Sequence, residues 1–191
     1  MVLDTTGLSL EEAGREHGKA FRSGWVPYYL VKLAKDPAWS YQLFPWDRII
    51  AFNGYSTVAA LDGSGMLEGL MAFCPSENEM KVAFLSTSPW NHGAGRARKG
   101  VGAAMVSVAV DYSVAAGFDG QLVLSSTQES EGFYTKLQFV RTGDEDDEGL
   151  AIFRLPIDRA KKHRATYAPI QPKAAAPSPA SPPPPPPPVT P

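Results

Sequence analysis

The pattern of hydrophobic and polar positions predicts helices at the start of the chain and a sheet after them. In the first helix a serine can act as the cap, with acidic residues early and basic residues late, which suits the helix dipole. A proline opens the second helix, and Asp36-Pro37 ends it. Helices are predicted over residues 9–22, 27–35, 100–116 and 131–137. Short apolar runs between turn residues predict strands over residues 56–61, 66–73, 79–87, 121–126, 140–143 and 150–155.

The helix predicted over residues 100–116 is the most apolar element of the chain. Only Ser107, Asp111 and Ser113 interrupt its apolar residues, so we expect it to lie buried against a sheet. It stands between two predicted strands, and a strand–helix–strand unit within one sheet is a right-handed parallel crossover. The element order therefore predicts an α/β fold with a mixed sheet and N-terminal helices.

The C-terminal residues have a composition that cannot build a core. Residues 172–191 contain 11 prolines, seven of them consecutive at 182–188. Such a segment lacks backbone donors and apolar anchors, and polyproline II is its expected conformation. We therefore predict one domain over residues 1–160, with a core at 56–155, and a basic, then proline-rich disordered tail over residues 161–191.

Charge and cysteine content narrow the class of protein. The chain has 191 residues and a net charge of −2, which gives no overall bias toward nucleic acid or membrane. Its single cysteine, Cys74, excludes an internal disulfide and suits a reducing compartment. Residues 1–11 lack the pattern of a signal peptide, and no apolar run approaches the roughly 20 residues of a membrane helix. We expect a soluble, cytoplasmic protein without nucleic-acid or membrane partners.

A glycine-rich basic loop leads from the third predicted strand into the apolar helix. It reads Gly93-Ala94-Gly95-Arg96-Ala97-Arg98-Lys99-Gly100-Val101-Gly102. Small residues before a helix N-terminus let backbone amides approach a phosphate group. The loop is not a Walker A motif, because Gly95-x4-Gly100 is followed by Val101. It is not a dinucleotide fingerprint either, because the sixth residue counted from Gly93 is Arg98.

The loop is similar to the acetyl-CoA loop of the GNAT superfamily of N-acetyltransferases, Gln/Arg-x-x-Gly-x-Gly/Ala. Residues 97–102 match this pattern except at Ala97, where Gln or Arg is usual. Further along, Phe133-Tyr134-x-Lys136-x-x-Phe139 resembles the second motif of the family, with Thr127 in place of Asn and Gln138 in place of Gly. Because that glycine ends a helix in a left-handed turn, Gln138 predicts a strained or different cap. The resemblance spans roughly residues 56–155 and implies a GNAT-like fold.

The family resemblance implies transfer of an acetyl group from acetyl-CoA to a primary amine by direct attack, without a metal. It implies that Tyr134 protonates the leaving thiolate as general acid. Main-chain groups of Leu85, Ser86 and Thr87 would bind pantetheine and polarise the acetyl carbonyl. The remaining acetyl-CoA contacts would come from Thr127 and from a pyrophosphate cradle of Arg98, Lys99, Gly100, Val101, Gly102 and Ala103.

The sequence leaves the general base and the acceptor open. Glu79 and His92 are candidate bases, although a strand-end carboxylate and a loop histidine are ordinarily solvated. Cys74 has no adjacent histidine and is expected to be a small buried hydrophobe. The acceptor is expected between the N-terminal helices and the last hairpin. We expect a cationic small-molecule or peptide amine, drawn by the acidic turn at residues 144–148 and by aromatic side chains that otherwise pack the core. These are Trp25, Tyr28, Tyr29, Trp39, Tyr41, Phe44 and Trp46.

Two other classes of protein stay open at this point. The substitutions at Ala97, Thr127 and Gln138 favour a non-catalytic, acyl-CoA-binding or regulatory relative. The proline-rich tail favours an interaction protein whose tail docks into an aromatic groove. Whether the chain forms a homodimer is also open.

Overall fold

The computed structural model describes residues 8–37, 39, 41–92 and 98–166, with the side chains of residues 164–166 excepted. Within these residues seven strands form one sheet in the order β1-β2-β3-β4-β5-β7-β6. The strands are β1 (Ser9–Glu12), β2 (Ser56–Leu61), β3 (Leu67–Ser76), β4 (Glu79–Thr87), β5 (Leu122–Ser126), β6 (Val140–Glu145) and β7 (Ala151–Leu155). Only β4 and β5 run parallel, and the other neighbours are antiparallel. The predicted mixed α/β sheet is confirmed.

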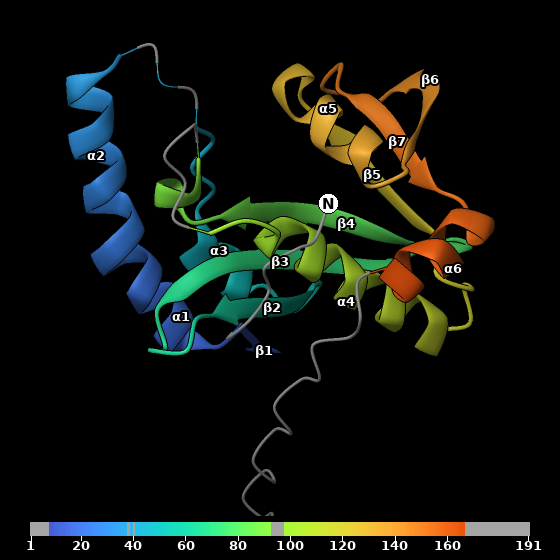
Figure 1. Cartoon of the computed structure of the whole chain (residues 1–191), viewed down its shortest axis with the longest axis horizontal. Helices are drawn as coiled ribbons and strands as arrows, with labels where there is room; N and C mark the ends of the chain where they lie inside the picture. Colours follow the sequence, from blue (N-terminus) through green and yellow to red (C-terminus); the bar gives the residue numbers. More distant parts are fainter. Residues whose placement is uncertain (1–7, 38, 40, 93–97, 167–191) are drawn as a thin grey trace, which may run out of the picture.

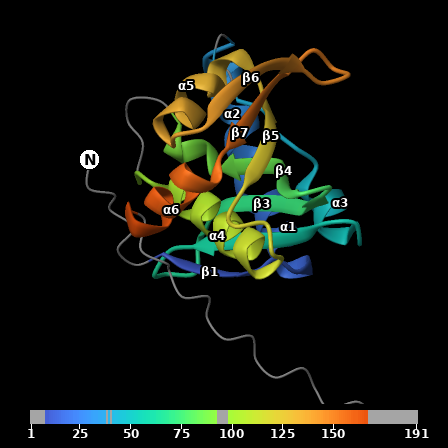
Figure 2. The same cartoon turned by 90° about the vertical axis from the view of Figure 1, so that its right-hand side faces the viewer.

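Helices cover both faces of this sheet (Figures 1 and 2). They are α1 (Arg15–Ala20), a π-helical segment (Phe21–Trp25), α2 (Val26–Lys35), α3 (Trp46–Ala51), a 3-10 turn (Pro89–Asn91), α4 (Val101–Ala115), α5 (Gln128–Lys136) and α6 (Ile157–Thr166). Trp25 and Trp46 pack against one face of the sheet, and α4 packs against the other. As predicted, α4 is buried along most of its length.

Close packing of α4 on the sheet depends on Gly69 of β3. A Cβ atom at Gly69 would lie 2.4 Å from the Met105 sulfur and 3.0 Å from Val101 Cγ1. Met105 is fully buried and both neighbours belong to α4, so neither side chain has room to withdraw. Gly69 therefore sets how deeply the first turn of α4 sits against β3.

Two sequence predictions fail at the ends of the described chain. The first predicted helix begins instead as the edge strand β1, because Leu10 is buried opposite Ala60 of β2 and the helix starts only at Arg15. The tail predicted to begin at residue 161 is helical through Thr166, because Ala160 and His163 of α6 are buried, Ala160 in the core that α4 shares. The proline-rich segment itself lies outside the described residues. The single domain at residues 1–160 stays a prediction.

The parallel pair β4–β5 is short and then opens. The two strands pair only at Met80↔Leu122 and Lys81↔Val123. Just beyond, the β3–β4 register jumps from Phe73↔Val82 to Ala72↔Phe84, so Ala83 is an extra residue in β4. Such a bulge bends a strand and strengthens its twist. In both views β5 rises away from β4 past this point (Figures 1 and 2).

Candidate active site

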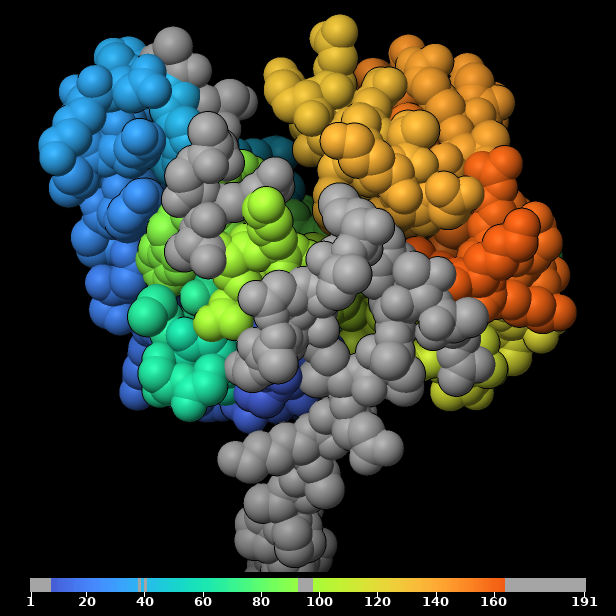
Figure 3. Space-filling model, in the orientation of Figure 1, coloured from blue at the N-terminus to red at the C-terminus, as the bar shows by residue number. Residues whose placement is uncertain are grey.

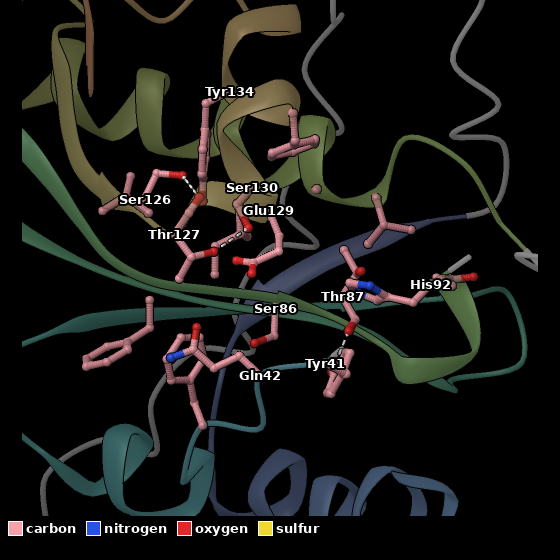
Figure 4. A pocket seen from close by; sticks show the side chains of 18 of the residues that line it. Tyr41, Gln42, Ser86, Thr87, His92, Ser126, Thr127, Glu129, Ser130 and Tyr134 are labelled. Atoms are coloured by element: carbon pink, nitrogen blue, oxygen red, sulfur yellow. Dashed lines mark hydrogen bonds between the residues drawn. The ribbon is translucent and has the colours of Figure 1, made fainter. Parts of the chain in front are cut away.

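The opening between β4 and β5 holds a cavity of about 740 Å³. Its lining comes from β4, the end of β5, the first turn of α4, α5 and the chain segment before α3. Figure 3 shows the surface hollowed between the N-terminal helices and α5, and Figure 4 shows the side chains inside. Most of the predicted site residues line this cavity: Leu85, Ser86, Thr87, Gly100, Val101, Gly102, Ala103, Thr127 and Tyr134.

Arg98 and Lys99 do not line the cavity, which corrects the predicted extent of the amide cradle. The Arg98 amide donates to the Asn91 side-chain oxygen at 2.8 Å. The Arg98 guanidinium lies 3.6 Å from the Asp62 carboxylate. The Arg98 amide is therefore already hydrogen-bonded within the protein. Residues 93–97 of the predicted loop lie outside the described residues.

The first turn of α4 faces the cavity. Gly100 caps this helix with φ +87°, a conformation that glycine adopts without a steric penalty. The first N–H groups of an α-helix have no acceptor within the helix, and the helix dipole places partial positive charge there. A Cβ atom at Gly102 would lie 2.9 Å from the Phe133 ring of α5. Glycine therefore lets α4 and α5 meet at the cavity wall.

A buried carboxylate that sequence reasoning missed fixes the approach to α4. Glu68 of β3 is 3% exposed, and its Oε2 accepts from the Ser88 hydroxyl at 2.9 Å and the Asn91 amide at 2.5 Å. The Trp90 indole donates to the same oxygen at 3.1 Å. Asn91 in turn holds the Arg98 amide. The sequence feature that could have indicated this role is that Glu68 is the single carboxylate in an otherwise apolar strand. A charge buried in such a strand requires hydrogen-bond partners.

Tyr134 reaches the cavity from α5 (Figure 4). Its side chain is buried between the rings of Phe133 and Phe139, and burial raises the pKa of the Tyr134 hydroxyl to about 12. Among the described residues the hydroxyl has no hydrogen-bond partner. It therefore holds its proton at neutral pH and can donate it to a ligand.

The helix that carries Tyr134 ends as the sequence predicts, in an unusual cap. Gln138 has φ +72°, in the left-handed region that favours glycine. The turn is held by hydrogen bonds from the Gln138 amide to Thr135 and from the Phe139 amide to Tyr134, at 3.0 and 3.1 Å. Gln138 thus takes up a strained left-handed turn at the end of α5.

Aromatic side chains form the wall across β4 from Tyr134. The Tyr41 hydroxyl donates to the Thr87 carbonyl at 2.7 Å, and burial raises the pKa of Tyr41. The Trp39 ring stacks on Tyr41, while the His92 ring meets Tyr41 edge-on. Of the aromatic residues predicted for the acceptor pocket, Trp39, Tyr41 and Phe44 line the cavity, but Trp25 and Trp46 are fully buried core residues.

None of residues 144–148 of the acidic turn lines the cavity. The prediction that this turn helps to form the acceptor pocket is therefore wrong. The Asp146 carboxylate instead accepts from the Glu148 and Leu150 amides at 3.0 and 2.9 Å. A side-chain hydrogen bond with Ser125, followed by these backbone hydrogen bonds, lowers the pKa of Asp146. The carboxylate therefore shapes the β6–β7 turn.

Of the two candidate general bases, only His92 lines the cavity. Glu79 is hydrogen-bonded to Arg154 at 3.0 and 3.2 Å and lies outside the cavity lining. His92 lines the cavity, and partial burial lowers its pKa. Glu129, which sequence reasoning missed, also lines the cavity from the first turn of α5 (Figure 4). The sequence feature that could have pointed to Glu129 is its position two residues after Thr127. Cys74 lies half-buried in β3, away from the lining.

No family model matches this sequence, and no curated protein matches it. Solved structures do resemble it. PaiA N-acetyltransferase from Thermoplasma acidophilum, solved with coenzyme A, has a TM-score of 0.52 at 12% identity, over 77% of this chain and 97% of that one. A GNAT acetyltransferase from Listeria monocytogenes has a TM-score of 0.55 at 11% identity, over 81% and 98%. A mutant spermidine N-acetyltransferase from Vibrio cholerae has a TM-score of 0.53 at 14% identity, over 82% and 97%.

These likenesses extend over nearly the whole of each solved chain. The protein therefore has the fold of the GNAT acetyltransferases, and the family resemblance seen in the sequence is confirmed at the level of the fold. Within the described residues, no helix is long and apolar enough to cross a membrane.

Proposed function

We propose that the protein is an N-acetyltransferase that moves an acetyl group from acetyl-CoA to a primary amine by direct attack. One observation carries the proposal: the first turn of α4 and the Tyr134 side chain line the same cavity, along the edge of β4 that β5 leaves open. In this arrangement the N-terminal end of α4, which can bind an anion, and the proton donor Tyr134 are connected by the edge of β4 that has no partner from β5.

The phosphate end of the donor suits the first turn of α4. The amides of Val101, Gly102 and Ala103 are the helix-terminal groups that line the cavity. The dipole of α4 adds partial positive charge at the same place. We assign the pyrophosphate of acetyl-CoA to these three residues.

The thioester arm suits the open edge of β4. One edge of β4 pairs with β3 at Leu70↔Ser86 and Met71↔Leu85, while past Lys81 the edge toward β5 has no strand partner among the described residues. Unpaired backbone groups at a strand edge bind an extended ligand much as they bind another strand. An amide-containing arm lying there would end near Thr87, with Tyr134 across the opening.

Tyr134 can carry the proton transfer to the leaving group, while the proton of the ammonium is released to solvent. A free alkylamine has a pKa of about 10.4 and must lose a proton before it attacks. Its nitrogen then bonds to the thioester carbonyl carbon, and the carbon–sulfur bond breaks with its electron pair on sulfur. Tyr134 donates its proton to that thiolate, and the proton lost from the new amide nitrogen returns to Tyr134 through solvent. The net products are the acetamide, coenzyme A and one proton.

A second candidate function is acyl-CoA binding without turnover. The observation that favours it is the position of Glu79, a candidate general base that is hydrogen-bonded to Arg154 and lies outside the cavity lining. A cytoplasmic location and a homodimer stay predictions under either function.

Two measurements on the full chain test the proposal. Calorimetry should show acetyl-CoA binding, and a thiol-release assay should show turnover with primary amines. In Tyr134→Phe we expect acetyl-CoA affinity to stay within about twofold while kcat falls about 100-fold. Absence of acetyl-CoA binding would sink the enzyme assignment. Binding without release of thiol from any amine would favour the second candidate.

A further inference from the structure

One wall of the cavity is formed by Trp39, Tyr41, Gln42 and Phe44. Tyr41 and Gln42 of this wall lie across β4 from Tyr134 (Figure 4). If the acetyl donor occupies the α4 and α5 side, as proposed above, an attacking amine must approach from this opposite wall. The chemistry of the wall therefore decides which amines fit. This inference rests on the proposed function and goes beyond it.

The wall is a fixed aromatic platform. The Trp39 and Tyr41 rings are stacked, with centroids 5.4 Å apart and planes 6° from parallel. His92 meets the Tyr41 ring edge-on at 4.7 Å. The Tyr41 hydroxyl is tied to the Thr87 carbonyl at 2.7 Å, next to the place assigned to the thioester. Rings held in this way bind a flat apolar group without losing further freedom.

This wall lacks the carboxylates that would bind the several ammonium groups of a polyamine. Among the described lining residues Glu129 is the only carboxylate, and it projects from α5, on the donor side of the opening. The wall itself carries no charged side chain: the Gln42 amide is neutral, and the Tyr41 hydroxyl already donates to the Thr87 carbonyl. A second ammonium group on the acceptor would lose water there and gain no charged partner.

We propose that the acceptor is a monoamine with an aromatic or otherwise flat, apolar body that packs on Trp39 and Tyr41. Its amino group points along β4 toward Thr87, where the nitrogen bonds to the acetyl carbon and the carbon–sulfur bond breaks as described above. The wall thus selects the body of the substrate, while the groups around Thr87 and Tyr134 act on its nitrogen.

Matched acceptors test the inference in the full chain with saturating acetyl-CoA. We expect kcat/KM for 2-phenylethylamine to exceed that for butylamine and for spermidine by about tenfold or more. In Trp39→Ala this value should fall about tenfold for 2-phenylethylamine and by a clearly smaller factor for butylamine, whereas Trp39→Phe should keep most of it. Phe52→Ala is the matched control, because Phe52 is 58% exposed and lies outside the cavity lining.

Failure of this inference can be told apart from failure of the proposed function. A preference for spermidine, or an equal loss for all amines in Trp39→Ala, overturns the aromatic acceptor site while acetyl transfer stands. Saturation-transfer NMR of 2-phenylethylamine with the full chain and coenzyme A gives a readout that needs no turnover. A signal that Trp39→Ala removes and Phe52→Ala keeps supports the site, and absence of any signal overturns it.

Discussion

The side-chain oxygen of Asn91 accepts the amide hydrogen of Arg98 at 2.8 Å, across the described ends of the loop that precedes α4. The amide nitrogen of Asn91 donates in turn to the buried Glu68 carboxylate of β3. The start of α4 is thus tied to the middle of the sheet by one side chain. Its position does not depend on the loop alone.

Asn91→Ala should therefore loosen the phosphate end of the cavity. It leaves both the Arg98 amide and the Glu68 carboxylate short of a partner, so we expect a loss of about 1–3 kcal/mol in the free energy of unfolding. Acetyl-CoA affinity should fall several-fold. Urea denaturation and calorimetry check the two effects, with Asn53→Ala in an exposed turn as control. Unchanged affinity in a destabilised Asn91→Ala would contradict the positioning role.

The raised pKa of Tyr134 predicts the pH dependence of turnover. The protonated hydroxyl is the active form of a general acid, and it is lost only as pH rises through about 12. An ordinary tyrosine would be half deprotonated at about pH 10. We expect kcat to show no descending limb up to about pH 10.5. A descending limb near pH 10 that Tyr134→Phe abolishes would show that the hydroxyl titrates normally and contradict this prediction.

Gln138→Gly should stabilise the protein. The residue has φ +72°, and an L side chain in the left-handed region costs about 1 kcal/mol relative to glycine. Part of this gain is offset because glycine has more freedom in the unfolded chain. We expect a rise in the urea midpoint for Gln138→Gly and none for Gln138→Ala, which keeps the strain. Destabilisation by glycine would mean that side-chain contacts of Gln138 outweigh its backbone strain.

Glu129→Gln should strengthen the binding of acetyl-CoA. The carboxylate shares the cavity with the first turn of α4, so it repels the pyrophosphate proposed to bind there. We expect a gain of a few-fold in affinity at low salt that shrinks at about 1 M salt, where charges are screened. Glu131→Gln is the control, since Glu131 sits on the same helix beside Arg141 and outside the lining. Weaker binding in Glu129→Gln would assign the carboxylate a favourable contact with the ligand.

Local patterns predicted the middle of the fold well. Residues 79–87 form β4 with the predicted bounds, and α4 begins one residue after Gly100 as its glycine-rich entry indicates. Both elements carry strong local signals, namely polar–apolar alternation at the start of β4 and a long apolar run in α4. β1 carries none, because four residues at a sheet edge are held by pairing with β2, about 50 residues away in sequence.

The residues of the candidate site that belong to a sequence motif could be predicted. Contacts between residues far apart in the sequence could not. The α4 turn, Thr127 and Tyr134 follow from two short motifs and line one cavity. The contact between Glu68 and Asn91 joins residues 23 positions apart, and no local pattern reports it. The acidic turn was misassigned because its charge suggested a ligand, while Asp146 uses its oxygens on neighbouring amides.

The missing side chain at Gly69 lets β3 fix the start of α4, which is the longest helix among the described residues. A methyl group there would act as a wedge under Met105, and α4 would have to tilt or lift as a rigid rod. A helix displaced near its N-terminus moves most at that end. A substitution at Gly69, inside the sheet, would therefore misalign the first turn of α4 at the cavity.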